Sequence, residues 1–287
     1  METRNAVFAG SWYPDSAADC EREIEAFLRE GLEPRETSGR WLGGIVPHAG
    51  WFYSGRIACN VINWLKDDKA PDVVVLFGMH LHPGSSNYIM PHGAWQTPFG
   101  DLPVAESLAE HLLQRHSFVE ETPRRFNQDN TIEVQLPFVK YLLDPGAILA
   151  LGVPPVQRSL DIGRTVADWA RRQGCTLKII GSTDLTHYGA NYGFRPHGSG
   201  ERAVQWVKQT NDQGVIDAML KMAPDKVIQQ GLENQNACCS GAAATALASA
   251  MHMGANKARQ VAYATSYDKS PGDSFVGYVG VVFGKSD

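Results

Sequence analysis

Short runs of consecutive apolar residues recur along the chain, and each run ends in a polar turn. The runs that predict strands lie at 43–46, 72–77, 147–153 and 177–180. The run at 72–77 is rich in β-branched residues and has no polar alternation, which is typical of a strand buried on both faces of a parallel sheet. Two later runs, at 260–264 and 275–283, predict a final pair of strands that can be antiparallel.

Between these runs, apolar residues recur at the spacing of an amphipathic helix, as Ile57, Val61 and Leu65 do. Capping residues and proline mark several expected starts. Helices are expected after Asp15 or Ser16, at 56–65, from Pro103, at 162–172, over 200–231 with a break at 212–214, and from Cys239 to His252. A polar loop is expected at 33–40, and Ile132, Val134 and Leu136 alternate as they would along a strand.

The alternation of strands and helices predicts an α/β fold with a central, mostly parallel or mixed sheet flanked by helices. We see no internal repeat and no linker in the sequence. The prediction is therefore a single domain over residues 1–287. If the strands are parallel neighbours, the turns that follow them converge on one crevice at the carboxyl edge of the sheet.

The composition removes several classes of function. The chain has a net charge of −5 and a pI near 6.0, without clusters of Lys and Arg, so nucleic acid binding is not expected. No apolar run approaches the roughly 20 residues of a membrane span, and residues 1–5 do not resemble a signal peptide. The five cysteines are sparse and odd in number, which favours a reduced, cytoplasmic protein. Nucleotide-binding motifs are absent from the sequence.

Histidines occupy two of the turns that follow predicted strands. His48 lies in a Pro-His-Ala-Gly turn, where it can be a metal ligand, an acid/base group or a turn histidine bonded to backbone. His80 and His82 follow the next strand, and we expect one to face the crevice and the other to be structural. His92 is interpreted as a loop histidine.

Asp184 and His187 follow the strand predicted at 177–180. Their spacing of three would place both on one side of a helical turn. A carboxylate beside an imidazole raises the basicity of the imidazole and fixes its tautomer, as an acid/base pair requires. The alternative is that Asp184 only caps a helix.

Cys238 and Cys239 form an unusual dipeptide before an alanine-rich helix. A thiol at a helix N-terminus has a lowered pKa and is a competent metal ligand or nucleophile. The alternative, expected for at least one of the two, is a small buried side chain packed where the helix meets the sheet.

Several of these segments together resemble one known family. The segments are Gly-Ser-Trp-Tyr-Pro at 10–14, Pro-His-Ala-Gly-Trp at 47–51, Glu-Val-Gln-Leu-Pro-Phe at 133–138, Ser-Thr-Asp-Leu-Thr-His-Tyr-Gly at 182–189 and Thr-Ser-Tyr-Asp at 265–268. In this order they resemble the Memo family, whose prokaryotic members are called AmmeMemoRadiSam system protein B. The resemblance covers nearly the whole chain and implies a fold similar to class III extradiol dioxygenases.

The resemblance also implies a metal site of two histidines and a cysteine, which correspond here to His48, His80 and Cys239. Asp184 and His187 match the pair that lines the same pocket. Two departures stand out. The usual Gly-Pro-Xaa-His is Phe-Gly-Met-His at 77–80, which keeps His82 as the second choice of ligand. Asn130 replaces a pocket histidine, which could weaken proton transfer while leaving metal binding intact.

The expected function is that of a mononuclear non-haem metalloprotein with dioxygenase-like oxidoreductase chemistry. Two imidazoles and a thiolate suit iron as Fe(II), and also copper as Cu(I) or zinc. The alternative is a metal carrier or a module that binds a peptide or protein without turnover, with radical SAM and AMMECR-type proteins as expected partners. A dioxygenase fold that has lost its metal is the third possibility.

Overall fold

Four parallel strands form the centre of the fold, which is seen here in a computed structural model that describes residues 1–30, 32 and 39–286. Their order across the sheet is β2 (Arg40–Val46), β9 (Leu177–Ser182), β3 (Val73–Gly78) and β8 (Ala147–Gly152). All residues of β3 are buried, which confirms the strand that the apolar run predicted. The polar loop expected at 33–40 lies largely outside the described residues.

Other strands extend this centre on both sides and make the sheet mixed. On one side β12 (Phe275–Lys285) runs antiparallel to β2, and it also pairs with β11 (Lys257–Thr265) and β10 (His187–Tyr188). The β11–β12 ladder confirms the expected antiparallel pair. On the other side β4 (Asn87–Ile89) is antiparallel to β8, and β7 (Phe118–Glu120) follows it. A separate small sheet contains β1 (Thr3–Arg4), β5 (Ala94–Trp95) and β6 (Leu102–Pro103).

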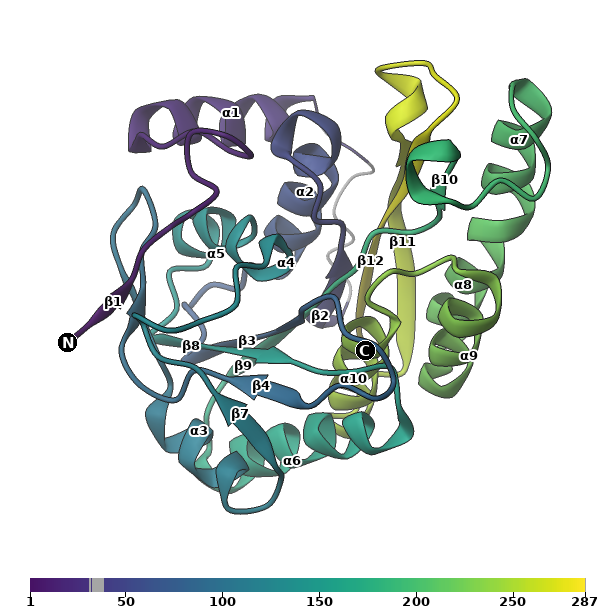
Figure 1. Cartoon of the computed structure of the whole chain (residues 1–287). Coiled ribbons are helices and arrows are strands. Elements are labelled where there is room, and N and C mark those ends of the chain that lie inside the picture. The colour runs from purple at the N-terminus through teal and green to yellow at the C-terminus, as the bar shows by residue number, and fades with distance from the viewer. Residues whose placement is uncertain (31, 33–38, 287) are drawn as a thin grey trace.

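Helices cover both faces of the sheet (Figure 1). One face carries α1 (Ala17–Arg29), α2 (Arg56–Trp64), α4 (Asn130–Glu133) and α5 (Leu136–Leu142). The opposite face carries α3 (Glu106–Leu113), α6 (Gln157–Gln173) and α10 (Ser240–His252). Beside β11 and β12 lie α7 (Glu201–Trp206), α8 (Asp212–Leu220) and α9 (Pro224–Asn234). The α/β fold with a mixed, helix-flanked sheet is thus confirmed.

Some helices begin where the sequence predicted, and others begin elsewhere because of contacts with distant residues. The Ser16 side chain accepts from the Asp19 N–H and caps α1, as expected. Pro103 instead belongs to β6, and α3 begins at Glu106, because Pro103 pairs with Ala94 in the small sheet. Among the described residues, no helix combines the length and apolar character that a membrane crossing requires.

Two further boundaries differ from the sequence pattern. The alternation from Ile132 to Leu136 falls in α4 and α5, because Leu136 and Val139 continue an apolar helical face that is buried against the core. The expected break at 212–214 is also wrong. A π-helical turn at Val207–Asn211 continues directly into α8, and the chain turns later, at Met222, which has a φ of 52°.

Candidate metal centre

The carboxyl ends of β2, β3 and β9 meet at one edge of the sheet. His48 follows β2, His80 follows β3 and Asp184 follows β9. A cavity of about 590 Å³ opens there, lined among others by these three residues, Asn130, His187 and Tyr192. The structure therefore brings together residues that the sequence placed in separate turns, because parallel strands end at the same edge.

Four side chains in this region could hold a single metal ion. His48, His80, Cys238 and Cys239 each offer one donor atom, and these atoms all lie within 4.8 Å of one another. The two Sγ atoms are 3.8 Å apart, and Cys238 Sγ is 3.3 Å from His48 Nε2. Tetrahedral coordination with metal–sulfur bonds of about 2.3 Å separates two sulfurs by about 3.8 Å. The residues present therefore fit a metal ion.

The surroundings of His48 fix which ring nitrogen faces the cluster. His48 is buried, and its Nδ1 lies 2.9 Å from Ser182 Oγ. The Ser182 hydroxyl donates its own proton to the Thr131 carbonyl at 2.6 Å, so Ser182 Oγ is the acceptor and Nδ1 is the donor. This leaves Nε2 directed at Cys238 Sγ, as a ligand nitrogen with an anchored partner nitrogen would be.

His80 is held in the same way by a carboxylate. Its Nδ1 donates to Asp129 Oδ2 at 3.1 Å, and the same oxygen accepts from the His80 backbone N–H at 3.2 Å. Partial burial opposes a charge on the ring, but the bonds to Asp129 and to Cys238 outweigh it and raise the pKa of His80 to about 10. The charged form of the His80 imidazole is therefore favoured beside Cys238.

Cys238 and Cys239 differ in their proton affinity. Burial opposes a thiolate at Cys238, yet hydrogen bonds from Cys239, His48 and His80 lower the pKa of Cys238 well below its usual value. Burial and the neighbouring Cys238 raise the pKa of Cys239. These hydrogen bonds favour the thiolate form at Cys238, whereas the family resemblance named Cys239 as the metal ligand.

The backbone before α10 sets the position of both thiols. The Cys238 N–H donates to the Asp184 carbonyl at 3.1 Å, and the Cys239 N–H donates to Thr183 Oγ1 at 3.0 Å. The turn that leads from α9 to the two cysteines begins at Gln235, which has a φ of 50°. The link after β9 therefore fixes the two cysteines against the histidines.

Asp184 and His187 line the same cavity, but the link between them is extended and not helical. The helical turn expected from their spacing is therefore wrong, and Asp184 caps no helix. Asp184 Oδ1 accepts from the His48 N–H at 2.7 Å, while His187 Nδ1 lies 3.1 Å from the Leu185 carbonyl. Burial raises the pKa of Asp184, and nearby His48 and His187 oppose this rise.

The remaining sequence candidates lie around the cluster. His82 is exposed, and its N–H donates to Ser85 Oγ. His92 pairs with Glu106 on the surface, as expected for a loop histidine. Asn130 lines the cavity, and its Nδ2 donates to the His48 carbonyl at 2.8 Å. In place of a titrating histidine, this position therefore carries an amide that fixes the turn of His48.

The comparisons with known proteins agree with this architecture. Residues 4–282 match the family model described as Memo-like protein. The chain belongs to the Memo family. A MEMO1 family protein of Pyrococcus furiosus is 29% identical and covers 99% of both chains. A MEMO1 family protein of Methanosarcina acetivorans is 31% identical over 98% of this chain and 99% of its own.

A solved structure extends the likeness to the fold. An uncharacterized protein from Escherichia coli K12 superposes with a TM-score of 0.55, at 12% identity, over 85% of this chain and 99% of its own. At this identity the likeness concerns the fold only. Membership of the Memo family and a possible His/Cys metal site are therefore what sequence and structure together support.

Proposed function

We propose that this Memo family protein binds a single iron ion and performs dioxygenase-like oxidoreductase chemistry on a small molecule. The ligands in this proposal are His48, His80 and the cysteine pair, in which Cys238 joins Cys239. The observation that supports it is the convergence of two imidazole nitrogens and two sulfurs beside an open cavity. Bound iron would supply one-electron redox chemistry beside that cavity, which His48 and His80 line.

Two groups in the cavity can hold or move a proton for such a reaction. His187 uses Nδ1 on the Leu185 carbonyl, which leaves Nε2 free to accept a proton. Asp184 is fixed by the His48 N–H, and the nearby His187 opposes the rise that burial causes in the pKa of Asp184. In this proposal, Asp184 and His187 are the catalytic residues, with His187 moving the proton and Asp184 stabilising its charged form.

The cavity could seat a planar small molecule. Its wall includes Tyr53, Tyr192 and Tyr278, and its rim includes the hydroxyls of Ser266 and Ser270. Aromatic faces stack on flat ligands, and hydroxyls fix their orientation. The acid/base pair lies in the same wall, so a bound molecule would contact both the metal site and the proton carrier.

A second candidate function is metal carriage, and the donor count favours it. Four donors at tetrahedral spacing can close the coordination of Cu(I) or zinc and leave no open position for substrate. A closed site stores or transfers an ion. In this second proposal the recipient is a partner protein of the radical SAM or AMMECR type.

Elemental analysis of protein purified without a metal-affinity tag tests both candidates. Iron near one equivalent, together with oxygen uptake on addition of an aromatic diol, would support the first. Stoichiometric copper or zinc without oxygen uptake would support the second. His48→Ala is the control for specific binding. Parent protein that contains no stoichiometric metal would refute both proposals.

A further inference from the structure

Residues 127–133, called here the hub segment, hold both histidines of the metal centre. Asp129 orients His80, and the Asn130 amide fixes the backbone carbonyl of His48. The Thr131 carbonyl accepts from Ser182, which in turn anchors His48 Nδ1. The position of the ligand nitrogens therefore depends on where the hub segment lies.

The hub segment also holds the turn that aims His80. Met79 has a φ of 72°, a left-handed conformation that is strained for a non-glycine residue. Its N–H donates to Thr131 Oγ1 at 2.7 Å, and the Thr131 hydroxyl donates to Asp129. A shift of the hub segment would release this turn as well as the His80 ring.

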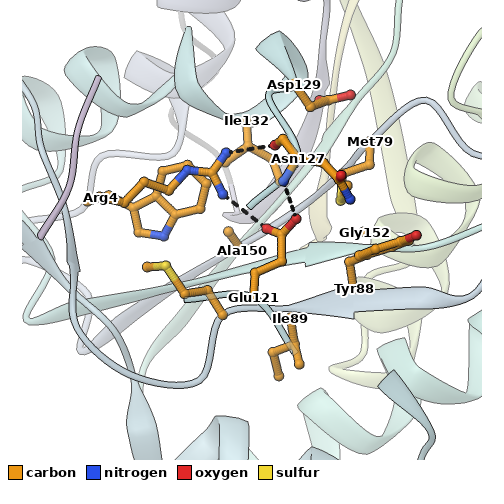
Figure 2. Close-up of a pocket in the computed structure, with 12 residues that line it drawn as sticks. Arg4, Met79, Tyr88, Ile89, Glu121, Asn127, Asp129, Ile132, Ala150 and Gly152 are labelled. Atoms are coloured by element: carbon orange, nitrogen blue, oxygen red, sulfur yellow. Dashed lines mark hydrogen bonds and ion pairs between the residues drawn. The ribbon is translucent and has the colours of Figure 1, made fainter. Parts of the chain in front are cut away.

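A buried ion pair anchors the start of the hub segment (Figure 2). Arg4 Nη1 donates to Glu121 Oε2 at 3.0 Å, and Arg4 Nη2 donates to the Asn127 carbonyl at 3.2 Å. Glu121 Oε1 accepts from the Asn127 N–H at 2.7 Å. The side chains of Arg4 and Glu121 are only 3% and 9% exposed, so both polar groups of the Asn127 backbone are held inside the protein.

The geometry around Arg4 favours a positioning role over a purely stabilising one. Its guanidinium lies between the rings of Trp95 and Phe126, at 3.9 and 3.8 Å from their centroids. Its Nε nevertheless finds no acceptor among the described residues. Buried ion pairs contribute little net stability compared with apolar side chains of the same shape, so specificity of arrangement is the better explanation.

Close packing connects this ion pair to the ligand turn. The cavity between them is only about 10 Å³, room for a single water molecule, and Arg4, Met79 and Asp129 all line it. Protein interiors of this density transmit a displacement and do not absorb it. The end of β1 is thereby coupled to His80.

We propose that Arg4 and Glu121 are positioning residues for the metal centre: they fix the hub segment, which in turn aims His48 and His80. The inference rests on the proposed metal binding. It predicts that removing the ion pair loosens the ligands even though neither residue contacts them. Losing the outer partner of a ligand typically costs 10- to 100-fold in metal affinity, and we expect about tenfold here because Arg4 acts through Asp129.

The test compares Arg4→Met with a control that removes another buried cation. Lys178→Met is matched, because Lys178 is 2% exposed and pairs with Asp67 at 2.7 Å. It lies near the start of β9, whereas Ser182 at the other end of that strand faces the site. Each full-length variant is titrated with Co²⁺ alone at a temperature where circular dichroism shows it folded. The visible spectrum then reports on the sulfur and nitrogen ligands.

We expect Arg4→Met to bind Co²⁺ about tenfold more weakly with an altered spectrum, and Lys178→Met to match the parent in both. Parent-like affinity in folded Arg4→Met, or an equal loss in Lys178→Met, would overturn the inference. If Arg4→Met does not fold, Arg4→Met combined with Glu121→Leu removes the unpaired charge and answers the same question.

A parent protein that binds no Co²⁺ would refute the proposed function and not this inference. In the metal-free protein, the inference is then tested through the nuclear magnetic resonance signal of the His80 Nδ1 proton, which is hydrogen-bonded to Asp129. We expect that signal to persist in Lys178→Met and to be lost by exchange in Arg4→Met. Its persistence in Arg4→Met would count against the positioning role.

Discussion

The hydrogen bond between His48 Nε2 and Cys238 Sγ spans the place where a metal ion would join the two side chains. These atoms are 3.3 Å apart, and Ser182 holds the other ring nitrogen. Metal and proton thus compete for the same pair of donors, so binding releases protons.

Replacement of His80 and His82 separates the two candidate ligands at the end of β3. We expect His80→Ala to weaken metal binding about a hundredfold, because one of four ligands carries about 3 kcal/mol of a typical site. His82→Ala should change affinity less than twofold, since its ring is exposed and outside the cluster. Competition with a chromogenic chelator measures both. Equal losses of metal affinity in the two variants would mean that His80 is not the ligand that distinguishes the end of β3.

The two cysteines make a second comparison. Cys238 Sγ contacts His48 and carries the lowered pKa, so Cys238→Ser should weaken metal binding more than Cys239→Ser does. Both losses should exceed tenfold if both sulfurs are ligands. Direct metal analysis after dialysis checks the order. Stoichiometric metal in Cys238→Ser would return the ligand role to Cys239 alone, as the family resemblance implied.

At the scale of elements, α8 holds the link that carries Asp184 and His187. Asp212 lies at the first residue of α8 and accepts from the N–H and hydroxyl of Thr186, in the middle of the link. Its other oxygen accepts from the Tyr263 hydroxyl of β11 at 2.7 Å. Burial raises the pKa of Asp212 to about 6, against the opposing bonds from Thr186 and Tyr263.

Stability should therefore respond to pH through this carboxyl. Between about pH 4 and 6 the folded state keeps the Asp212 proton that the unfolded state has lost, so the free energy of unfolding falls as pH rises. Asp212→Asn has no carboxyl to titrate, so its free energy of unfolding should not fall in this way. Relative to the parent, it should rise by up to about 3 kcal/mol over that range. Urea denaturation at several pH values measures it. The control is Asp217→Asn on the exposed face of α8, and parallel profiles for Asp212→Asn and the parent would contradict the expectation.

Many of the strands and helices could be predicted from the sequence, because buried strands appear as continuous runs of apolar residues. The runs at 72–77 and 177–180 therefore predicted both strands and the edge where the site lies. The link at 184–187 could not be predicted, since it is extended only because β10 pairs with β12 and Thr186 is held by Asp212. The roles of Asp129 and Ser182 also depend on partners far away in sequence. The arrangement of Cys238 and Cys239 could not be predicted either, because it depends on backbone bonds to Asp184 and Thr183 and on the left-handed turn at Gln235.

At the scale of the whole molecule, bound metal should raise the melting temperature. The four donors come from the ends of β2 and β3 and from the start of α10, so an ion that binds only the folded state links distant parts of the chain. Free metal at 100 times its dissociation constant adds about 2.7 kcal/mol, which corresponds to about 4–5 °C for a protein of this size.

Thermal denaturation with metal and with a chelator checks this expectation. The parent protein should lose the extra stability when the chelator is added. His48→Ala should show the same melting temperature under both conditions, because it has lost a ligand. An equal chelator effect on both proteins would place the responsible ion elsewhere.

The place of β12 in the sheet has a consequence for how the molecule is made. This strand follows all other described strands along the chain, yet it lies between β2 and β11 and is buried over nearly its whole length. During synthesis, one edge of β2 therefore waits, open and apolar, until residues 275–285 have emerged from the ribosome. Pairing over such a long sequence separation is slow, and an open edge recruits other chains. The nascent protein is accordingly exposed to aggregation until β12 has paired with β2, and a chaperone would protect it best during that interval.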